Sequence, residues 1–329
     1  MYLHRWLPVQ AASFILAVPS AASTAKRGLV FTPNSAWPED NYIWTRPPSE
    51  LSWYYNYDVT PSPVYNNISQ TALEFVPMLW GAPERMSDTS FLASVKTLIA
   101  QGTNVRHVMA FNEPELSMEY GGSNVEPGVA AKVWVSNILP LQALGVKVGL
   151  PACSGSSDAV PWLKEMLANC SELVSTSTEV RSCAYDFVPL HWYGSFDGLA
   201  GHIGTYAAAF PDSPLWVTEF NYNNQSLVTT QEYFNTSIAY LERLAYVERY
   251  SYFGAFRSSV SNVGPNAAML SAGGQLTDIG AWYLGERAAG IPPQSTSDSA
   301  GALSGSRPLL LCVLVFWLVG KVLVAETRN

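Results

Sequence analysis

Charged side chains are the scarcest feature of this 329-residue chain. Asp, Glu, Lys and Arg together make up 13% of the residues, which is about half of the roughly 25% found in a typical soluble domain. This composition excludes a coiled coil, which is rich in periodic charge, and the 12% of aromatic residues excludes a disordered chain. The net charge of −8 excludes a nucleic-acid-binding protein, because such a protein needs a basic surface.

Histidine and cysteine are also rare, with four residues of each. No Cys/His spacing fits a zinc site, so we expect no metal and no other cofactor. Cys170 and Cys183 flank a polar stretch, and we expect them to form a disulfide on the surface. Cys153 is then left as a buried thiol.

Aromatic residues are abundant, including 11 Trp and 17 Tyr. Between residues 28 and 297 there are 24 acidic and 12 basic side chains, so this part of the chain carries about −12. A surface that is poor in charge and rich in flat rings suits a neutral, flat-faced partner. The composition therefore suggests a sugar ligand.

Both ends of the chain read as targeting segments. Residues 1–22 have the charge, apolar run and small residues of a secretory signal peptide. Lys26 and Arg27 are compatible with a second, dibasic processing site or with a polar lead into the first strand. Four sequons fit an exported glycoprotein, and we rank Asn224 below the other three as a glycan site: Asn67, Asn169, Asn224 and Asn235.

The C-terminal part combines a polar spacer, residues 294–308, with an apolar tail, residues 309–325. Small residues, spacer and tail together are typical of a GPI attachment signal, with Ser297 or Ser299 as the acceptor. Lys321 interrupts the tail and charged residues end the chain, so a short membrane-spanning helix is the alternative. In both cases we expect a membrane-attached protein at the cell surface or wall, exported through the ER.

Residues 26–293 remain as one domain, close to the ~250 residues of a (β/α)₈ TIM barrel. Apolar, β-rich runs alternate with helical patterns every 20 to 40 residues or so, as expected for parallel βα units. The first two units, around residues 34–48 and 58–70, lack helical periodicity, so we expect irregular loops there. The predicted strands are 28–32, 51–57, 74–80, 107–112, 147–151, 186–192, 215–220 and 250–256. The predicted helices are 90–101, 127–144, 159–169, 199–210, 230–244 and 280–289.

Two glutamates stand where predicted strands end. Glu113 follows Asn112 at the end of the fourth strand, and Pro114 turns the chain away from helical geometry. Glu219 ends the seventh strand after an apolar run. In a (β/α)₈ barrel these ends meet at the active-site face. Two converging carboxylates are the equipment of a glycoside hydrolase, although a single strand-end Glu more often pairs with a cation.

Five segments make the chain resemble the glycosyl hydrolase catalytic core of glycoside hydrolase family 128: KRGLVF, VPMLWG, FNEPE, DFVPLHWYG and WVTEFN. That family comprises β-1,3-glucanases that are frequent in fungi and often attached to the cell surface. The resemblance implies a retaining mechanism, with Glu113 as acid/base and Glu219 as nucleophile. It also implies that Asn112 hydrogen-bonds the sugar 2-hydroxyl.

The other polar and aromatic residues near strand ends are candidate sugar contacts: Trp80, His191, Trp192, Tyr193, Asn221 and Tyr54. His191 either orients Glu219 or binds substrate. Glu115, two residues beyond the acid/base, is expected to be solvated or paired locally.

The sequence thus predicts a monomeric endo-β-1,3-glucanase acting on polysaccharide. The alternatives are a β-glycosidase or transglycosylase of another linkage, such as 1,4-glucan or mannan, and a surface glucan-binding protein without turnover.

Overall fold

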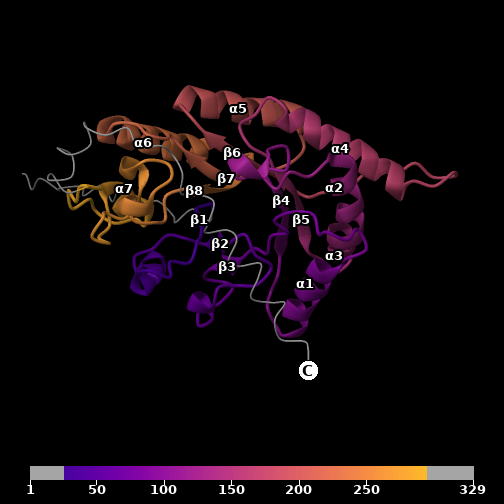
Figure 1. Ribbon diagram of the computed structural model, residues 1–329, viewed down its shortest axis with the longest axis horizontal. Helices are drawn as coiled ribbons and strands as arrows, with labels where there is room; N and C mark the ends of the chain where they lie inside the picture. Colours follow the sequence, from indigo (N-terminus) through magenta and orange to yellow (C-terminus); the bar gives the residue numbers. More distant parts are fainter. Residues whose placement is uncertain (1–25, 295–329) are drawn as a thin grey trace, which may run out of the picture.

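The computed structural model describes residues 26–294, drawn in colour in Figure 1. The predicted signal peptide, Ser297, Ser299 and the apolar tail lie outside these residues. Within residues 26–294, no helix is long and apolar enough to cross a membrane.

Between residues 26 and 294, eight parallel strands follow one another in chain order. They pair as three ladders, β1–β2–β3, β4–β5 and β6–β7–β8. Isolated parallel bridges join neighbouring ladders at Met78–Met109 and Gly149–Phe187, and another joins Arg27 to Tyr250. The strands are β1 Gly28–Val30, β2 Trp53–Tyr55, β3 Glu74–Phe75, β4 His107–Asn112, β5 Lys147–Ala152, β6 Val188–Tyr193, β7 Leu215–Asn221 and β8 Val247–Tyr252.

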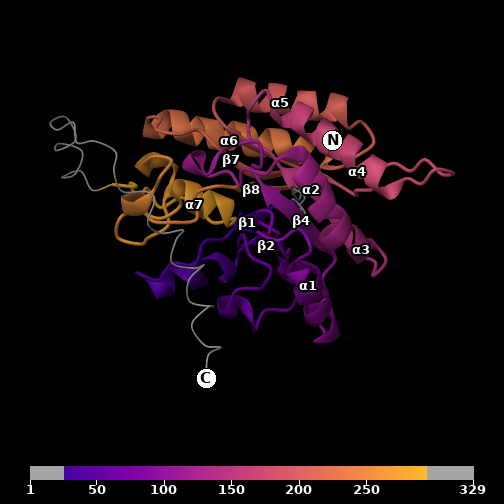
Figure 2. The ribbon, with the colours of Figure 1, turned by 45° about the vertical axis from the view of Figure 1, so that its right-hand side comes forward.

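The helices cross over between the strands, as parallel pairing requires. Figures 1 and 2 show the strands in the middle of the molecule and the long helices on its outside. The fold is therefore α/β, as predicted. The helices are α1 Ser90–Ala100, α2 Pro127–Val133, α3 Leu139–Gln142, α4 Ala159–Val174, α5 Phe196–Ala209, α6 Leu227–Arg243 and α7 Asp278–Tyr283.

Several predicted elements need correction. The strand predicted over 74–80 is only Glu74–Phe75, and the helix predicted over 280–289 is α7, Asp278–Tyr283. The helix predicted over 127–144 is broken by a π-helical turn, Trp134–Ile138, between α2 and α3. Pro140 has no N–H to donate to Ser136, which explains why the regular helix does not continue. The last strand lies at Val247–Tyr252, three residues before the predicted start. The irregular first two units are confirmed, with only the short 3₁₀ turns Pro38–Thr45 and Pro63–Tyr65 between their strands.

Successive side chains of a strand enter two different cores. One core lies inside the array of strands and contains Trp53, Tyr55 and Trp216. The other lies between strands and helices and contains Tyr54 and Phe75. Because both faces are covered, β4 is buried along its whole length.

Lys26 and Arg27 fasten the start of the domain. The Lys26 ammonium donates to the carbonyls of Leu241, Glu242 and Leu244, where α6 ends. The Arg27 guanidinium pairs with Glu50 at 2.8 Å. Both side chains are used structurally, which favours the polar lead into β1 over a processing site.

The predicted disulfide is confirmed. Cys170, on α4, is bonded to Cys183 with 5.5 Å between the Cα atoms, so the surface segment after α4 is closed into a loop. Cys153 is a buried free thiol, also as predicted.

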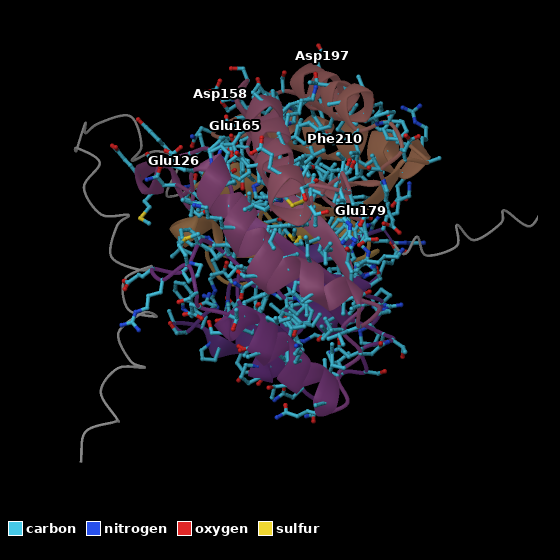
Figure 3. The ribbon with its side chains drawn as sticks, turned by 90° about the vertical axis from the view of Figure 1, so that its right-hand side faces the viewer. Glu126, Asp158, Glu165, Glu179, Asp197 and Phe210 are labelled. Atoms are coloured by element: carbon cyan, nitrogen blue, oxygen red, sulfur yellow. A yellow bond between two sulfur atoms is a disulfide. The ribbon has the colours of Figure 1, made fainter. Side chains whose placement is uncertain are left out.

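The acidic excess lies largely on exposed helices and their connections. Figure 3 shows side chains of this kind on the face formed by α2, α4 and α5: Glu126, Asp158, Glu165, Glu179 and Asp197. In contrast, the described part of the chain buries just four carboxylates: Asp40, Glu74, Glu113 and Glu219.

Candidate active site

The four buried carboxylates fall into two kinds. Asp40 is paired with Arg257 at 2.6 Å, and Glu74 is paired with Arg106 and Arg249. Glu113 and Glu219 have no Lys or Arg partner among residues 26–294, and instead both approach His191. A buried charge without a cation is costly, so this second kind of carboxylate calls for a functional reason.

Glu113 occupies a strained backbone position directly after β4. Its φ is 40°, in the left-handed region that few non-glycine residues adopt. The backbone N–H of Glu113 donates to Ala152 O at 2.8 Å, which fixes it to the end of β5. Pro114 therefore ends the strand as predicted, and the carboxylate turns inward at its end.

His191 connects the two carboxylates. It is fully buried on β6 and lies in register with Glu219 on β7. Its Nδ1 is 3.0 Å from Glu113 Oε1, and its Nε2 is 3.5 Å from Glu219 Oε1. Of the two roles proposed for His191, this position supports the orientation of the carboxylates.

Three tyrosine hydroxyls donate to Glu219. Tyr193 contacts Oε2 at 2.5 Å, while Tyr57 and Tyr55 contact Oε1 at 2.7 and 3.1 Å. These contacts orient the carboxylate and stabilise its negative charge. Tyr193 was predicted, but the sequence analysis missed Tyr55 and Tyr57. The sequence held no clear signal for them, because β2 is buried on both faces and ends at Tyr55, and Tyr57 follows it with a φ of 62°.

Burial and neighbouring charges shift the pKa values of the site residues. Burial raises the pKa of Glu113, and the Glu219 carboxylate adds to the effect, while the hydrogen bond from His191 opposes it. Burial and the negative charge of Glu219 raise the pKa values of Tyr57 and Tyr193 far above the usual value, so both remain donors. Burial lowers the pKa of His191, but Glu219 and Glu113 outweigh it, and the net direction is upward.

Ligand atoms of Glu113, His191 and Glu219 all lie within 4.8 Å of one another. Such a group is compact enough for a metal ion. However, both ring nitrogens of His191 already face carboxylates, and Glu219 already accepts three hydroxyl bonds. The arrangement is therefore better suited to sharing protons than to holding a cation, and we assign no metal to it.

Asn112 and Asn221 lie close to the pair in sequence and are held by backbone groups. Asn112 Nδ2 donates to Gly121 O at 3.2 Å, and its buried Oδ1 receives no hydrogen bond from the described residues. Asn221 Nδ2 donates to Phe253 O at 2.6 Å. Trp80 is half-buried after β3, and its carbonyl accepts from Asn112 N. Asn112 thus keeps a free acceptor beside Glu113, and Asn221 Oδ1 is likewise buried without a hydrogen bond from the described residues.

Two predicted sugar contacts are not brought to the carboxylates. Tyr54 lies in the core between strands and helices, where its hydroxyl accepts from Ser62 N at 3.1 Å. The Trp192 ring packs against His202 of α5, and its Nε1 donates to Ser195 O. Along the strands, Tyr54 precedes Tyr55, and Trp192 lies between His191 and Tyr193, all three of which belong to the site. The predictions for Tyr54 and Trp192 are therefore wrong by one residue along the strand.

Glu115 is half-buried rather than solvated. Its Oε1 accepts a hydrogen bond from Ser154 N at 2.6 Å, across to the segment after β5. Of the four sequons, Asn67, Asn224 and Asn235 are exposed and Asn169 is half-buried on α4.

An open pocket of about 220 Å³ lies between Tyr57 and the start of α1. Met78, Leu79 and Phe91 supply its apolar wall, and Ser90 and Ser94 of α1 supply hydroxyls. Tyr57 lines this pocket and also contacts Glu219, whereas Glu113 and Glu219 themselves do not line it.

Comparison with known proteins places this site in context. Residues 28–283 match the family model described as glycosyl hydrolase catalytic core. A curated relative, alkali-sensitive linkage protein 1 of Schizosaccharomyces pombe, is 28% identical over 271 residues, covering 79% of this chain and 44% of that protein. The chain therefore spans less than half the length of this relative.

Two solved structures share the fold and carry different descriptions. An endo-β-1,3-glucanase of Sorangium cellulosum matches with a TM-score of 0.64 and 24% identity, over 80% of this chain and 99% of that one. An oligosaccharide-binding protein of Cryptococcus neoformans matches with a TM-score of 0.60 and 24% identity, over 80% and 93%. Both are described as members of glycoside hydrolase family 128, the family that the sequence motifs indicated.

Proposed function

The chain belongs to the glycosyl hydrolase catalytic core family, and on that premise we propose that it is a retaining glycoside hydrolase that cleaves β-1,3-glucan. The observation that carries the proposal is the pair of buried carboxylates, Glu113 and Glu219, which face each other without a cationic Lys or Arg within residues 26–294. Glycoside hydrolysis needs this combination of one protonated and one ionised carboxyl.

The positions of the two groups support a double displacement. Glu113 donates its proton to the leaving glycosidic oxygen while Glu219 attacks the anomeric carbon and forms a glycosyl ester. Glu113 then takes a proton from water, whose oxygen attacks the same carbon and releases Glu219. Retaining enzymes separate their carboxyl groups by about 5–5.5 Å, and the ligand atoms of Glu113 and Glu219 lie within 4.8 Å.

We further propose that the eight strands form one (β/α)₈ barrel. The bridges that join the three ladders, and the bridge from Arg27 to Tyr250, support this arrangement. The proposal accounts for Glu113 and Glu219 meeting from β4 and β7, because the carboxyl ends of all the strands would share one face.

β-1,3-Glucan is proposed as the substrate because the Sorangium relative is described as acting on it. Endo action is proposed because the same relative is described as an endo-β-1,3-glucanase. Secretion, a GPI or membrane anchor, glycosylation and a monomeric state remain proposals from the sequence.

The Cryptococcus relative gives a specific reason to keep a binding protein as the second candidate. A binding protein has no need for a carboxyl with a raised pKa beside an oriented carboxylate, and Glu113 and Glu219 supply this combination. Hydrolysis or transglycosylation of another linkage is the third candidate, since the carboxylate pair does not determine which glycosidic linkage is cleaved.

The test compares the full chain with Glu113→Gln and Glu219→Gln on linear β-1,3-glucan, 1,4-glucan and mannan. We expect release of β-1,3-linked products by the wild type, a loss of about 10²–10⁴-fold in kcat for Glu113→Gln, and no measurable turnover for Glu219→Gln. Glu165→Gln, on the exposed face of α4, is the control and should retain full activity. Near-normal turnover in either active-site variant contradicts the proposal, and binding without products by the wild type supports the second candidate.

A further inference from the structure

Glu115 stands in an unusual place for an acidic residue. It lies two residues beyond the acid/base, is half-buried, and has no Lys, Arg or His nitrogen within ion-pair distance among the residues that the structure describes. One of its oxygens, Oε2, is buried and receives no hydrogen bond from a nitrogen or hydroxyl within the same range, and the buried Cys153 thiol is the neighbour that hydrogen-bonds the Glu115 side chain. The reaction proposed above does not use this carboxylate, so its position needs another explanation.

The other oxygen makes a connection between two strand ends. Glu115 Oε1 accepts from Ser154 N at 2.6 Å, so the side chain joins the loop after β4 to the segment after β5. One further bond crosses between the same elements, from Glu113 N to Ala152 O at 2.8 Å. These two bonds lie on either side of Pro114, and together they hold the short turn that carries the acid/base.

That turn has little freedom to rearrange. Glu113 has a φ of 40°, and its carbonyl accepts from Leu116 N at 3.0 Å. The Gly122 backbone passes so close that a Cβ there would lie 2.4 Å from Glu113 O. A strained residue keeps its conformation only when its surroundings over-determine it, and the Glu115–Ser154 bond is one of the surrounding constraints.

The uncompensated charge of Glu115 acts on neighbouring groups. Glu115 contributes to the raised pKa of Glu113 after burial and Glu219, and it contributes to the raised pKa of His191. It also adds to burial in raising the pKa of the Cys153 thiol, which keeps that thiol neutral.

Apart from His191, the titratable groups around Glu115 and Glu113 carry no compensating positive charge. On α5, burial lowers the pKa of His202 to about 4, so this imidazole is neutral near pH 7. Tyr206 of the same helix remains protonated. Tyr57, just after β2, and Tyr193 on β6 also lie near Glu113, and both are protonated.

We propose that Glu115 is a positioning residue of this active site. Its carboxylate holds the turn that carries Glu113 against the end of β5, and it places a negative charge without an ion-pair partner close to the acid/base. The fastening sets the direction of the Glu113 carboxyl, and the charge favours its protonated form. The inference rests on the proposed function for its kinetic consequence, but not for its effect on Glu113 itself.

Two substitutions separate the fastening from the charge. Glu115→Gln keeps the size and an acceptor oxygen for Ser154 N–H but removes the charge. Glu115→Asp keeps the charge on a side chain too short to reach Ser154. The matched control is Glu119→Gln, because Glu119 is exposed on the same loop and makes no hydrogen bond or ion pair within the described range.

The first measurement is an NMR titration of the Glu113 carboxyl, assigned through Glu113→Gln, in the full-length wild type and each variant. The proposal predicts that Glu115→Gln moves the Glu113 titration to lower pH, while Glu119→Gln leaves it in place. The second measurement is kcat and KM on β-1,3-glucan against pH. Glu115→Gln should shift the basic limb of the profile downward, whereas Glu115→Asp should lower kcat by about a hundredfold with little change in KM.

The outcomes separate this inference from the proposed function. If the wild type releases no product but the Glu113 titration still moves in Glu115→Gln, the proposed function fails and the role of Glu115 stands. If the wild type is active and Glu115→Gln leaves both the titration and the pH profile unchanged, the inference is overturned. An unchanged kcat in folded Glu115→Asp overturns the fastening role.

Discussion

The oxygens of Glu219 are shared among hydroxyl donors from two strands. Tyr57 and Tyr193 donate at 2.7 and 2.5 Å, one to each oxygen, and thereby hold the carboxylate in a single orientation. A nucleophile must be held within a fraction of an ångström of its attacking position for an efficient reaction. At the scale of single residues, catalysis in this account therefore depends on tyrosines as much as on the two glutamates.

Tyr57→Phe tests this dependence, because it removes one hydroxyl and keeps the ring. We expect kcat on β-1,3-glucan to fall by about ten- to a hundredfold, from lost orientation of Glu219. Tyr54→Phe is the matched control three residues away, since the Tyr54 hydroxyl contacts Ser62 N in the outer core. The account is contradicted if both variants keep the wild-type kcat, or if Tyr54→Phe loses as much as Tyr57→Phe while remaining folded.

The raised pKa of Glu113 gives a second prediction. Burial and the charge of Glu219 keep this carboxyl protonated to a higher pH than an exposed glutamate, as a general acid requires. We expect a bell-shaped dependence of kcat/KM on pH, whose basic limb follows the deprotonation of Glu113. The limb should vanish in Glu113→Gln when a substrate with an activated leaving group is used, and its persistence there would assign it to another group.

At the scale of elements, β4 was predictable from the sequence, while the ends of β2, β3 and β8 and the faces of β2 and β6 were not. The boundaries of β4 came out at His107 and Asn112, because an apolar run ends at Pro114. Trp192 and Tyr54 were misplaced because strands buried on both faces lack the polar alternation that reveals which residues point inward. Tyr55 and Tyr57 were missed for the same reason. The contact of Glu115 with Ser154 joins two loops, and no local sequence pattern encodes it.

The disulfide gives a prediction for α4. Its cysteines are 13 residues apart, and closing such a loop stabilises the fold by about 3 kcal/mol in the chain-entropy model. Cys183→Ser should lower the free energy of unfolding by about that amount, measured by denaturant titration, and leave kcat unchanged because α4 carries no active-site group. The double variant Cys170→Ser, Cys183→Ser should add little further loss. A large additional loss would show that the cysteines stabilise the fold through packing instead.

At the scale of the whole molecule, a second charged cluster lies at the opposite ends of the strands. Glu74 begins β3, His107 begins β4, and Arg249 lies on β8, and both of the latter contact the Glu74 carboxylate, at 2.6 and 2.7 Å. The Arg249 guanidinium also lies 4.3 Å from the ring of Trp216 on β7. The cluster therefore joins strands that are far apart in the sequence. Glu74 thus lies where its strand begins, whereas Glu113 and Glu219 lie toward the ends of β4 and β7.

The cluster makes stability depend on acid pH. Burial raises the pKa of Glu74, but His107 and Arg249 outweigh it and lower the pKa to about 2. A carboxyl with a lowered pKa stabilises the fold above its unfolded value, and the contribution disappears as pH falls toward about 2. Glu74→Gln should therefore lower the free energy of unfolding at pH 7 by about 3–5 kcal/mol, with a smaller difference from the wild type at acid pH.

Denaturant titrations at both pH values measure this effect. Glu179→Gln is the control, because it breaks an exposed ion pair with Arg181 and should leave the stability unchanged. Equal stability of Glu74→Gln and the wild type at pH 7 would contradict the structural role of the cluster.

The central claim is that Glu113 and Glu219 act as acid/base and nucleophile on β-1,3-glucan. Proton NMR of the first reducing ends that the full-length protein releases from a linear β-1,3-gluco-oligosaccharide tests it most directly. The account predicts that the β-anomer appears first and converts only slowly to the α-anomer, because two displacements at the anomeric carbon restore its configuration. Initial release of the α-anomer, or binding of the oligosaccharide with no cleavage at all, would contradict it.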